Sequence, residues 1–218
     1  MVLRSWYDFG GGSMADMGHY SLWTVFRALE LGSPAGVDPM LSHQCVFNGN
    51  VSTTVKNDFS FPTASVVRFR FPAKGVDLIW YEGGIHPSTP EQLGGKELPA
   101  EGMMFVGDKG KILAGFRVED PYILGTPAPQ PEPRGRRQSG NMEISPGLKQ
   151  WIACCRGGAQ SPGSFLHAGP ISDAVNLYAI ALRTRQPVVF DEQSVKITNS
   201  GAADRYLARE YRKGFEIA

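Results

Sequence analysis

The 218-residue sequence carries almost no net charge and contains no long hydrophobic run. Its 22 lysines and arginines nearly balance its 21 aspartates and glutamates, and the one basic cluster, residues 134–137, lies in a proline-rich stretch. A balanced surface recruits neither nucleic acid nor an anionic membrane. No segment has the length of a membrane span, and the N-terminal residues lack a signal-peptide core. We therefore expect no nucleic-acid partner, no membrane partner and a cytoplasmic location.

Cysteine is also scarce. The sequence has three, of which Cys154 and Cys155 are adjacent and Cys45 stands alone. Adjacent cysteines rarely bond to each other, so a disulfide framework is not expected. No Cys/His spacing is typical of zinc, so no metal site is predicted. We expect buried thiols in a reducing compartment.

The sequence does contain a glycine run, residues 10–12, followed directly by a helical pattern of apolar residues. This pattern predicts a helix over residues 13–31, ended by Gly32 and Pro34. Three aromatic residues, Trp6, Tyr7 and Phe9, stand before the glycines with no polar lead-in, as if another segment preceded them.

The start of this helix holds the best chemical candidates. Ser13 with Asp16 three residues later is typical of a capping box. Residues three and four apart are neighbours on a helix, so His19 and Tyr20 should lie beside Asp16. A carboxylate, an imidazole and a phenol can move protons, which makes Asp16, His19 and Tyr20 candidate catalytic residues. The alternatives are a cap for Asp16, a surface position for His19 and a core-edge position for Tyr20.

Between residues 36 and 116 the pattern changes to strands. Residues 66–71 alternate between apolar side chains and two arginines, which predicts a strand wetted on one side. A turn at 72–75 leads to a more fully buried strand at 76–81. The signal at 107–110 predicts a second hairpin, formed by 103–106 and 111–114.

Helices are expected to resume after a proline-rich loop at 125–146. The predicted elements are helices over 148–155, 170–185 and 202–212, with a short strand at 188–190. Pro170 suits the first position of its helix. The sum is an α+β fold: one domain over residues 1–218 with an open, mostly antiparallel sheet and helices packed on one face.

Candidate substrate contacts lie where the strand at 76–81 ends. Tyr81, Glu82 and His86 enter a glycine loop, and loops on a rigid sheet are where ligand contacts concentrate. The ring of Trp6 could stack on the apolar face of a ligand. The alternatives are a solvent-exposed loop and, for Trp6, an interface with another domain.

Taken in order, several stretches resemble the C-terminal domain of the Gfo/Idh/MocA oxidoreductases, the glucose–fructose oxidoreductase and inositol dehydrogenase family. They cover nearly the whole chain: WYDFGGGSMADMGHYSLW (6–23), IWYEGG (79–84), MMFVGDKGKIL (103–113), WIACCRGG (151–158), HAGPISDAVNLYAIALRTRQPVVFD (167–191), KITN (196–199) and YLAREYRKGFEI (206–217).

The resemblance implies a two-domain enzyme. An N-terminal Rossmann domain binds NAD or NADP, and this domain holds a sugar or polyol substrate and makes subunit contacts. Proton transfer in the family uses a lysine of the nucleotide domain, an aspartate, and a histidine or tyrosine four residues later. The last two fall on Asp16 and Tyr20, with His19 next to them.

The nucleotide fingerprint GxGxxG is absent, because Ala15 stands where the last glycine belongs. Two hypotheses follow. The chain is the substrate-binding and oligomerisation half of such an enzyme, inactive without a Rossmann domain that another segment or a separate chain supplies. Alternatively, it is a stand-alone, non-catalytic module for carbohydrate binding or assembly. Both predict a homo-oligomer joined through the open face of the sheet.

Overall fold

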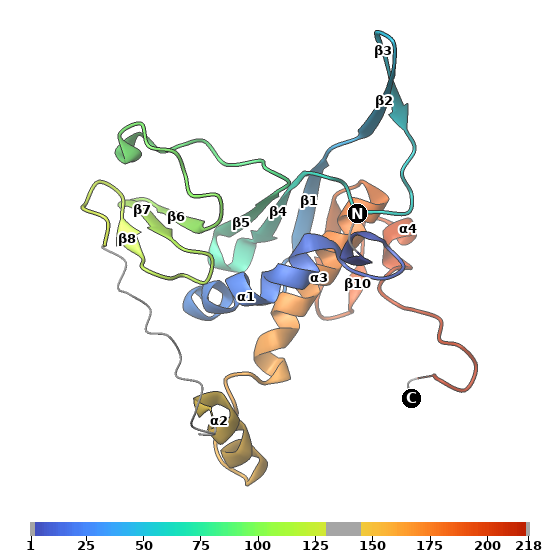
Figure 1. Ribbon diagram of the computed structural model, residues 1–218. Helices are drawn as coiled ribbons and strands as arrows, with labels where there is room; N and C mark the ends of the chain where they lie inside the picture. Colours follow the sequence, from blue (N-terminus) through green and yellow to red (C-terminus); the bar gives the residue numbers. More distant parts are fainter. Residues whose placement is uncertain (1–2, 130–144, 217–218) are drawn as a thin grey trace, which may run out of the picture.

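A five-stranded antiparallel sheet is the centre of the structure, a computed structural model that describes residues 3–129 and 145–216. Figure 1 shows helices packed on one face of this sheet, so the α+β prediction is confirmed. The strand order is β10–β9–β1–β4–β5, with bounds β1 Gly36–Leu41, β4 Ser65–Phe71, β5 Val76–Glu82, β9 Val188–Asp191 and β10 Lys196–Ile197.

The central strand β4 shows how the sheet separates its two faces. Val67 and Phe69 are completely buried under the helices, as the alternating pattern predicts. Arg68 and Arg70 point to the opposite face, where they form ion pairs with Asp77 of β5 and Asp38 of β1. Each ion pair therefore joins neighbouring strands on the face that the helices leave uncovered.

Two long helices, α1 (Gly12–Leu29) and α3 (Phe165–Thr184), cover the buried face. They run antiparallel, because the start of α1 at Gly12 lies against Tyr178 while Arg27 near its end reaches His167. Their inner stripes join the strands in one hydrophobic core, to which α1 contributes Met14, Leu22, Val25 and Phe26 and α3 contributes Ile171, Ala174, Leu177, Tyr178, Ala181 and Leu182.

The remaining elements lie around this core (Figure 1). The predicted hairpin at 103–114 is confirmed and belongs to a separate three-stranded sheet. A second hairpin, β2–β3, forms a sheet of its own. The bounds are β2 Gln44–Asn48, β3 Val51–Val55, β6 Met103–Gly107, β7 Gly110–Ala114, β8 Tyr122–Ile123, α2 Pro146–Cys155 and α4 Gly201–Asp204, with single 3₁₀ turns at Leu3–Ser5, Pro72–Lys74 and Glu91–Leu93.

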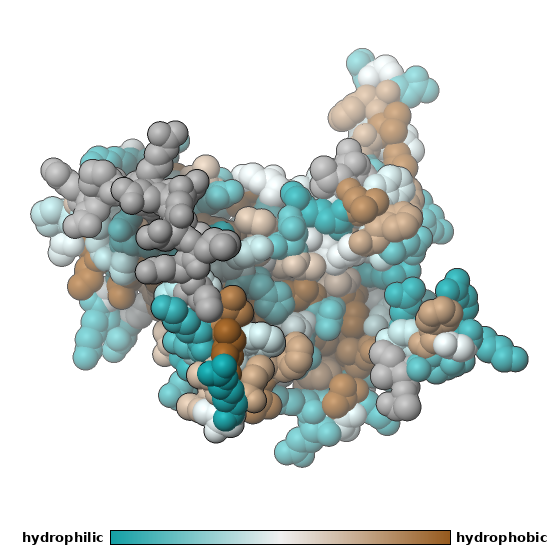
Figure 2. All heavy atoms as spheres, turned by 60° about the horizontal axis from the view of Figure 1, so that its bottom comes forward, coloured by the Kyte–Doolittle hydropathy of each residue, from teal (hydrophilic) through white to brown (hydrophobic). Residues whose placement is uncertain are grey.

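Helix α2 lies apart from the core and buries none of its residues. Apolar side chains on it and on the first turn of α3 face outward, including Trp151 and Phe165, and Figure 2 shows hydrophobic surface on this side of the molecule. None of the helices in the described part of the chain has the length and apolar character that a bilayer crossing requires.

Several predicted details are wrong. The thiols are not buried, because Cys45 and Cys155 are exposed and Cys154 is partly exposed. The capping box does not form, because α1 begins one residue earlier with Gly11 as its N-cap, and Ser13 lies inside the first turn. Helix α3 begins five residues before Pro170, whose missing N–H costs a single backbone hydrogen bond near an exposed helix end. The strand β5 is not the more buried strand, because it lies at the edge of the sheet with β4 as its only neighbour.

The closing helix at 202–212 is also shorter than predicted. In the described residues of this stretch only α4 is helical, with Ala203 as its buried residue, and residues 208–216 are exposed and not helical. The proline-rich loop predicted at 125–146 falls largely on residues 130–144, which lie outside the described residues.

Candidate functional site

Asp16 and Tyr20 lie one turn apart on the outward face of α1. Arg4 Nη1 donates a hydrogen bond of 2.8 Å to Asp16 Oδ2, and both side chains are about half exposed. Tyr20 is 56% exposed, and the guanidinium of Arg117, in the loop between β7 and β8, lies over its ring at 5.1 Å from the centroid. The carboxylate and the phenol each have a positive charge beside them and are open to a ligand from outside.

His19 points away from this pair. Its Nε2 lies 3.5 Å from the Ser172 hydroxyl of α3, which is at the limit of a hydrogen bond. The helix therefore brings together two of the three predicted catalytic residues, and it turns the third toward its packing partner.

A second polar cluster lies beneath the start of α1, centred on the Glu82 carboxylate at the end of β5. The Tyr178 hydroxyl donates to Oε1 at 2.7 Å, and the Trp80 indole N–H donates to Oε2 at 3.2 Å. The hydroxyls of Ser65 and Ser13 donate one bond each to the same two oxygens. Four donors from α1, β4, β5 and α3 thus converge on one carboxylate and fix the start of α1 to the sheet.

Tyr178 is the deepest member of this cluster. Burial raises the pKa of its phenol well above the usual 10.0, the negative charge of Glu82 raises it further, and the Ser13 and Ser65 hydroxyls lower it slightly. The phenol therefore stays protonated and remains a hydrogen-bond donor. Helical spacing alone places Tyr178 in the apolar inner stripe of α3, although a buried tyrosine usually has a partner for its hydroxyl.

The predicted substrate contacts are dispersed. Tyr81 lies on the sheet face opposite the helices, because its register partner is Val66, and His86 is exposed in the following loop. Trp6 stacks on Phe59 at 5.3 Å. Within the described residues, no hydrogen bond or ring contact joins any of these side chains to Asp16 or Tyr20. Glu82 accepts hydrogen bonds from Ser13, Ser65, Trp80 and Tyr178, and these bonds join α1 and α3 to the sheet.

A small hollow of about 270 Å³ lies next to the start of α1. It is lined by the N-terminal segment, α3 and the residues after α4, including Tyr7, Gly10 and Asn176. The Arg183 guanidinium lies over the rings of Tyr7 and Tyr206, at 5.1 and 4.6 Å. Burial raises the pKa of Tyr7, while the nearby arginines lower it. The hollow pairs aromatic rings with a cation but does not include Asp16 or Tyr20.

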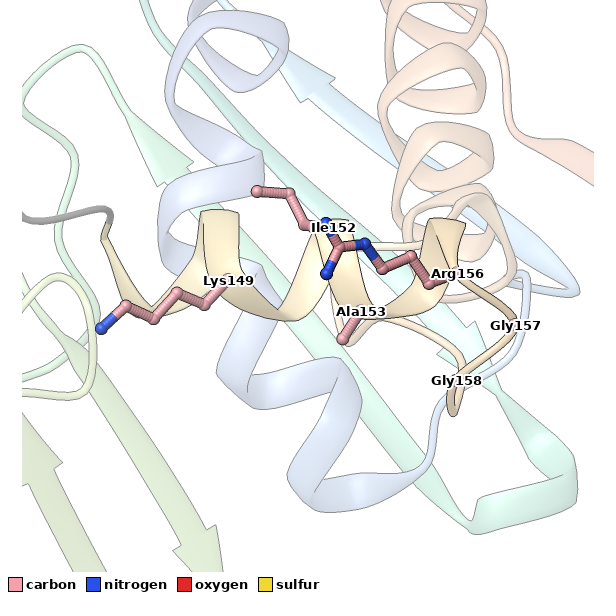
Figure 3. A pocket seen from close by; sticks show the side chains of 6 residues that line it. All are labelled: Lys149, Ile152, Ala153, Arg156, Gly157 and Gly158. Atoms are coloured by element: carbon pink, nitrogen blue, oxygen red, sulfur yellow. The ribbon is translucent and has the colours of Figure 1, made fainter.

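A wider hollow of about 650 Å³ lies against α2 and the loop that follows it (Figure 3). Lys149, Ile152 and Arg156 project from the helix beside it, and Gly157 and Gly158 form its other side. With walls from one exposed helix and its loop, this hollow lacks the convergent polar groups of a catalytic site.

The start of α1 does not fit the pyrophosphate of a bound dinucleotide. In the Rossmann arrangement, the pyrophosphate lies at the free N–H groups of a helix start that directly follows a strand. Helix α1 follows a 3₁₀ turn, and the Glu82 carboxylate already occupies the space below its first turn. In the described part of the chain, no three His, Cys, Asp or Glu side chains gather as metal ligands.

No protein-family model matches the chain, and no characterised protein matches it. A function can therefore be inferred only from the geometry of α1 and from the sequence stretches that resemble the Gfo/Idh/MocA oxidoreductases.

Proposed function

We propose that this chain is the substrate-binding and oligomerisation part of an NAD(P)-dependent sugar or polyol oxidoreductase of the Gfo/Idh/MocA type. The observation that carries the proposal is the outward placement of Asp16 and Tyr20, one turn apart, on a helix whose buried side is fixed by Glu82. In this proposal the nucleotide is held by another domain or by a separate chain, because the start of α1 lacks the strand-to-helix arrangement of a dinucleotide site.

In this proposal the exposed face of α1 holds a hydroxyl group of the substrate. The Tyr20 hydroxyl exchanges a proton with that group, and the Asp16 carboxylate accepts a hydrogen bond from a neighbouring hydroxyl. The guanidiniums of Arg4 and Arg117 lie beside the two side chains, Arg4 in an ion pair with Asp16 and Arg117 over the ring of Tyr20. A polyol suits the site because it offers adjacent hydroxyls that both donate and accept.

Two measurements test this role. Titration of the chain with a panel of sugars and polyols, followed by ligand-observed NMR, should detect binding that Asp16→Asn and Tyr20→Phe weaken. With a family nucleotide-binding domain supplied as a separate chain, NAD(P)H formation should appear, and Tyr20→Phe should lower kcat by about 10²-fold or more. The matched control is Tyr211→Phe, which changes an exposed tyrosine far along the chain. Activity that survives Tyr20→Phe unchanged would refute the assignment.

The uncovered sheet face favours the alternative, a stand-alone assembly module. Met40 is 63% exposed and Ile79 is 45% exposed on this face, and both lie among the ion pairs that join the strands. Self-association without sugar binding, and without activity in the presence of the nucleotide domain, would favour this alternative.

A further inference from the structure

The β2–β3 hairpin stands away from the rest of the molecule. Its two strands pair only with each other, and neither joins the five-stranded or the three-stranded sheet. In Figure 1 it projects beyond the end of β1, and Figure 2 shows it clear of the main body with hydrophobic side chains along its length. A two-stranded hairpin is only marginally stable in water, so this one should gain stability from a partner.

The composition of the hairpin is unusual for an exposed element. Residues 44–55 contain no Asp, Glu, Lys, Arg or His, and Phe47 is 74% exposed. Free strand edges are normally protected from pairing by charges, prolines or bulges. The strand β3 has no charge and no proline, and all five of its residues are exposed. Its outer edge is therefore free to pair with another strand.

The sequence of β3 is suited to pairing with itself. It reads Val51-Ser52-Thr53-Thr54-Val55, so an antiparallel copy centred on Thr53 places valine opposite valine, threonine opposite threonine and serine opposite threonine. Such β-branched and hydroxyl pairs stabilise neighbouring strands. Near a two-fold axis a residue lies close to its own copy, so a charged residue there would be repelled by the same charge. The uncharged strand β3 avoids this repulsion.

We propose that β3 pairs with β3 of a second copy of this chain about a two-fold axis at Thr53, forming a four-stranded sheet β2–β3–β3′–β2′. The inference does not depend on the proposed oxidoreductase role. Two such edges bury on the order of 500 Å² per copy, less than the roughly 800 Å² per partner of a stable complex. The pairing is therefore reversible and should dissociate on dilution.

A distance measurement tests the register. In a background with Cys45, Cys154 and Cys155 replaced by serine, Asn50→Cys is labelled with a nitroxide. The two labels lie six residues apart along the paired strands, about 20 Å between backbones. Double electron–electron resonance at high protein concentration should give one narrow distribution near that value. The absence of an intermolecular distance, or one beyond about 40 Å, would overturn the proposal.

A charge exchange tests the contact itself. Thr53→Lys and Thr53→Glu should each weaken self-association by about fivefold or more, because like charges meet at the axis. An equimolar mixture of the two should restore it, and Asn48→Lys on the outer strand should leave it within about twofold. Sedimentation velocity over a concentration series gives the constants, and circular dichroism checks the fold. Equal association of all variants, or no recovery in the mixture, would overturn the inference.

The same experiment separates this contact from the sheet-face contact. If Ile79→Lys abolishes self-association and Thr53→Lys leaves it unchanged, the hairpin proposal fails and the sheet-face contact stands. The opposite pattern supports the hairpin and refutes the sheet face.

Discussion

At the scale of single residues, the Glu82 carboxylate decides how the start of α1 is held. Its four hydrogen-bond donors are neutral groups, and no cation in the described part of the chain forms an ion pair with it. A partly buried charge without a counter-charge is stable only while all its donors are in place. The placement of Asp16 and Tyr20 therefore depends on a residue on the opposite side of their helix.

We expect Glu82→Gln to lower the free energy of unfolding by about 2 kcal/mol. The substitution replaces one carboxylate oxygen by an amide NH2 group, which cannot accept the hydrogen bonds that this oxygen received. Urea denaturation at neutral pH measures this change. The matched control is Glu97→Gln, which alters an exposed glutamate and should stay within about 0.5 kcal/mol of the wild type. Equal unfolding midpoints for Glu82→Gln and the wild type would show that the cluster does not hold the helix.

Tyr178 gives a prediction for alkaline pH. Burial raises its pKa in the folded state, so above pH 10 the unfolded chain loses this proton while the folded chain keeps it. The stabilisation that Tyr178 provides is thus complete below pH 10 and declines above it, by about 1.4 kcal/mol per pH unit. Tyr178→Phe should remove this component of the slope between pH 10 and 11.5 in urea denaturation. The exposed substitution Tyr211→Phe should leave the slope unchanged, and an equal effect of both would contradict the prediction.

At the scale of the elements, the turn after β5 depends on two glycines with different surroundings. Gly83 and Gly84 both have positive φ, at +71° and +83°. A Cβ on Gly83 would collide with the backbone of Thr63 and Ala64, whereas a Cβ on Gly84 would meet nothing within 4 Å. The turn that carries Glu82 into position therefore tolerates a side chain at one glycine and not at the other.

This difference makes the two glycines a matched pair. Gly84→Ala should cost about 1 kcal/mol, the strain of the left-handed backbone alone. Gly83→Ala should cost about 2–4 kcal/mol, because the backbone collision adds to that strain. Thermal and urea unfolding of the two variants check the ranking, and similar losses for both would contradict it.

Most elements of the core could be predicted, because their signals are local. The alternation at 66–71 and the stripe of Leu22, Val25 and Phe26 depend on periodicity, which fixes the buried face of an element. The hairpin β2–β3 is not predicted, because its uncharged strands lack alternation, although its two-residue turn, Gly49-Asn50, begins with the glycine that such turns favour. Helical spacing also predicted that Asp16 and Tyr20 share a face.

The Glu82 cluster could not be read from the sequence in the same way. Its members come from four elements separated by up to 165 residues, Ser13 and Tyr178 being the most distant. Only the docking of α1 and α3 on the end of β5 brings them together. A serine at a helix start is typical of a cap, and that local interpretation fails here because a carboxylate from the sheet is within reach.

At the scale of the whole molecule, α1 and α3 cover one face of the five-stranded sheet and leave its other face open to solvent. On the open face, Arg68–Asp77 and Asp38–Arg70 are already paired, so a partner can cover them without burying an isolated charge. Exposed apolar side chains lie between these pairs. Such a face can be buried against the identical face of a second copy. Self-association of the intact protein is therefore the property to measure.

We expect size-exclusion chromatography with light scattering to give at least twice the chain mass of 23.8 kDa at high protein concentration. If the uncovered sheet face carries the self-association, Ile79→Lys should shift the mass toward the monomer, because it adds a positive charge next to Arg68 on that face. The control is Val106→Lys, an exposed position on the three-stranded sheet, which should leave the mass unchanged. If the wild type stays monomeric at every concentration, the sheet face remains exposed in solution, and the proposed sheet-face contact between two copies is refuted.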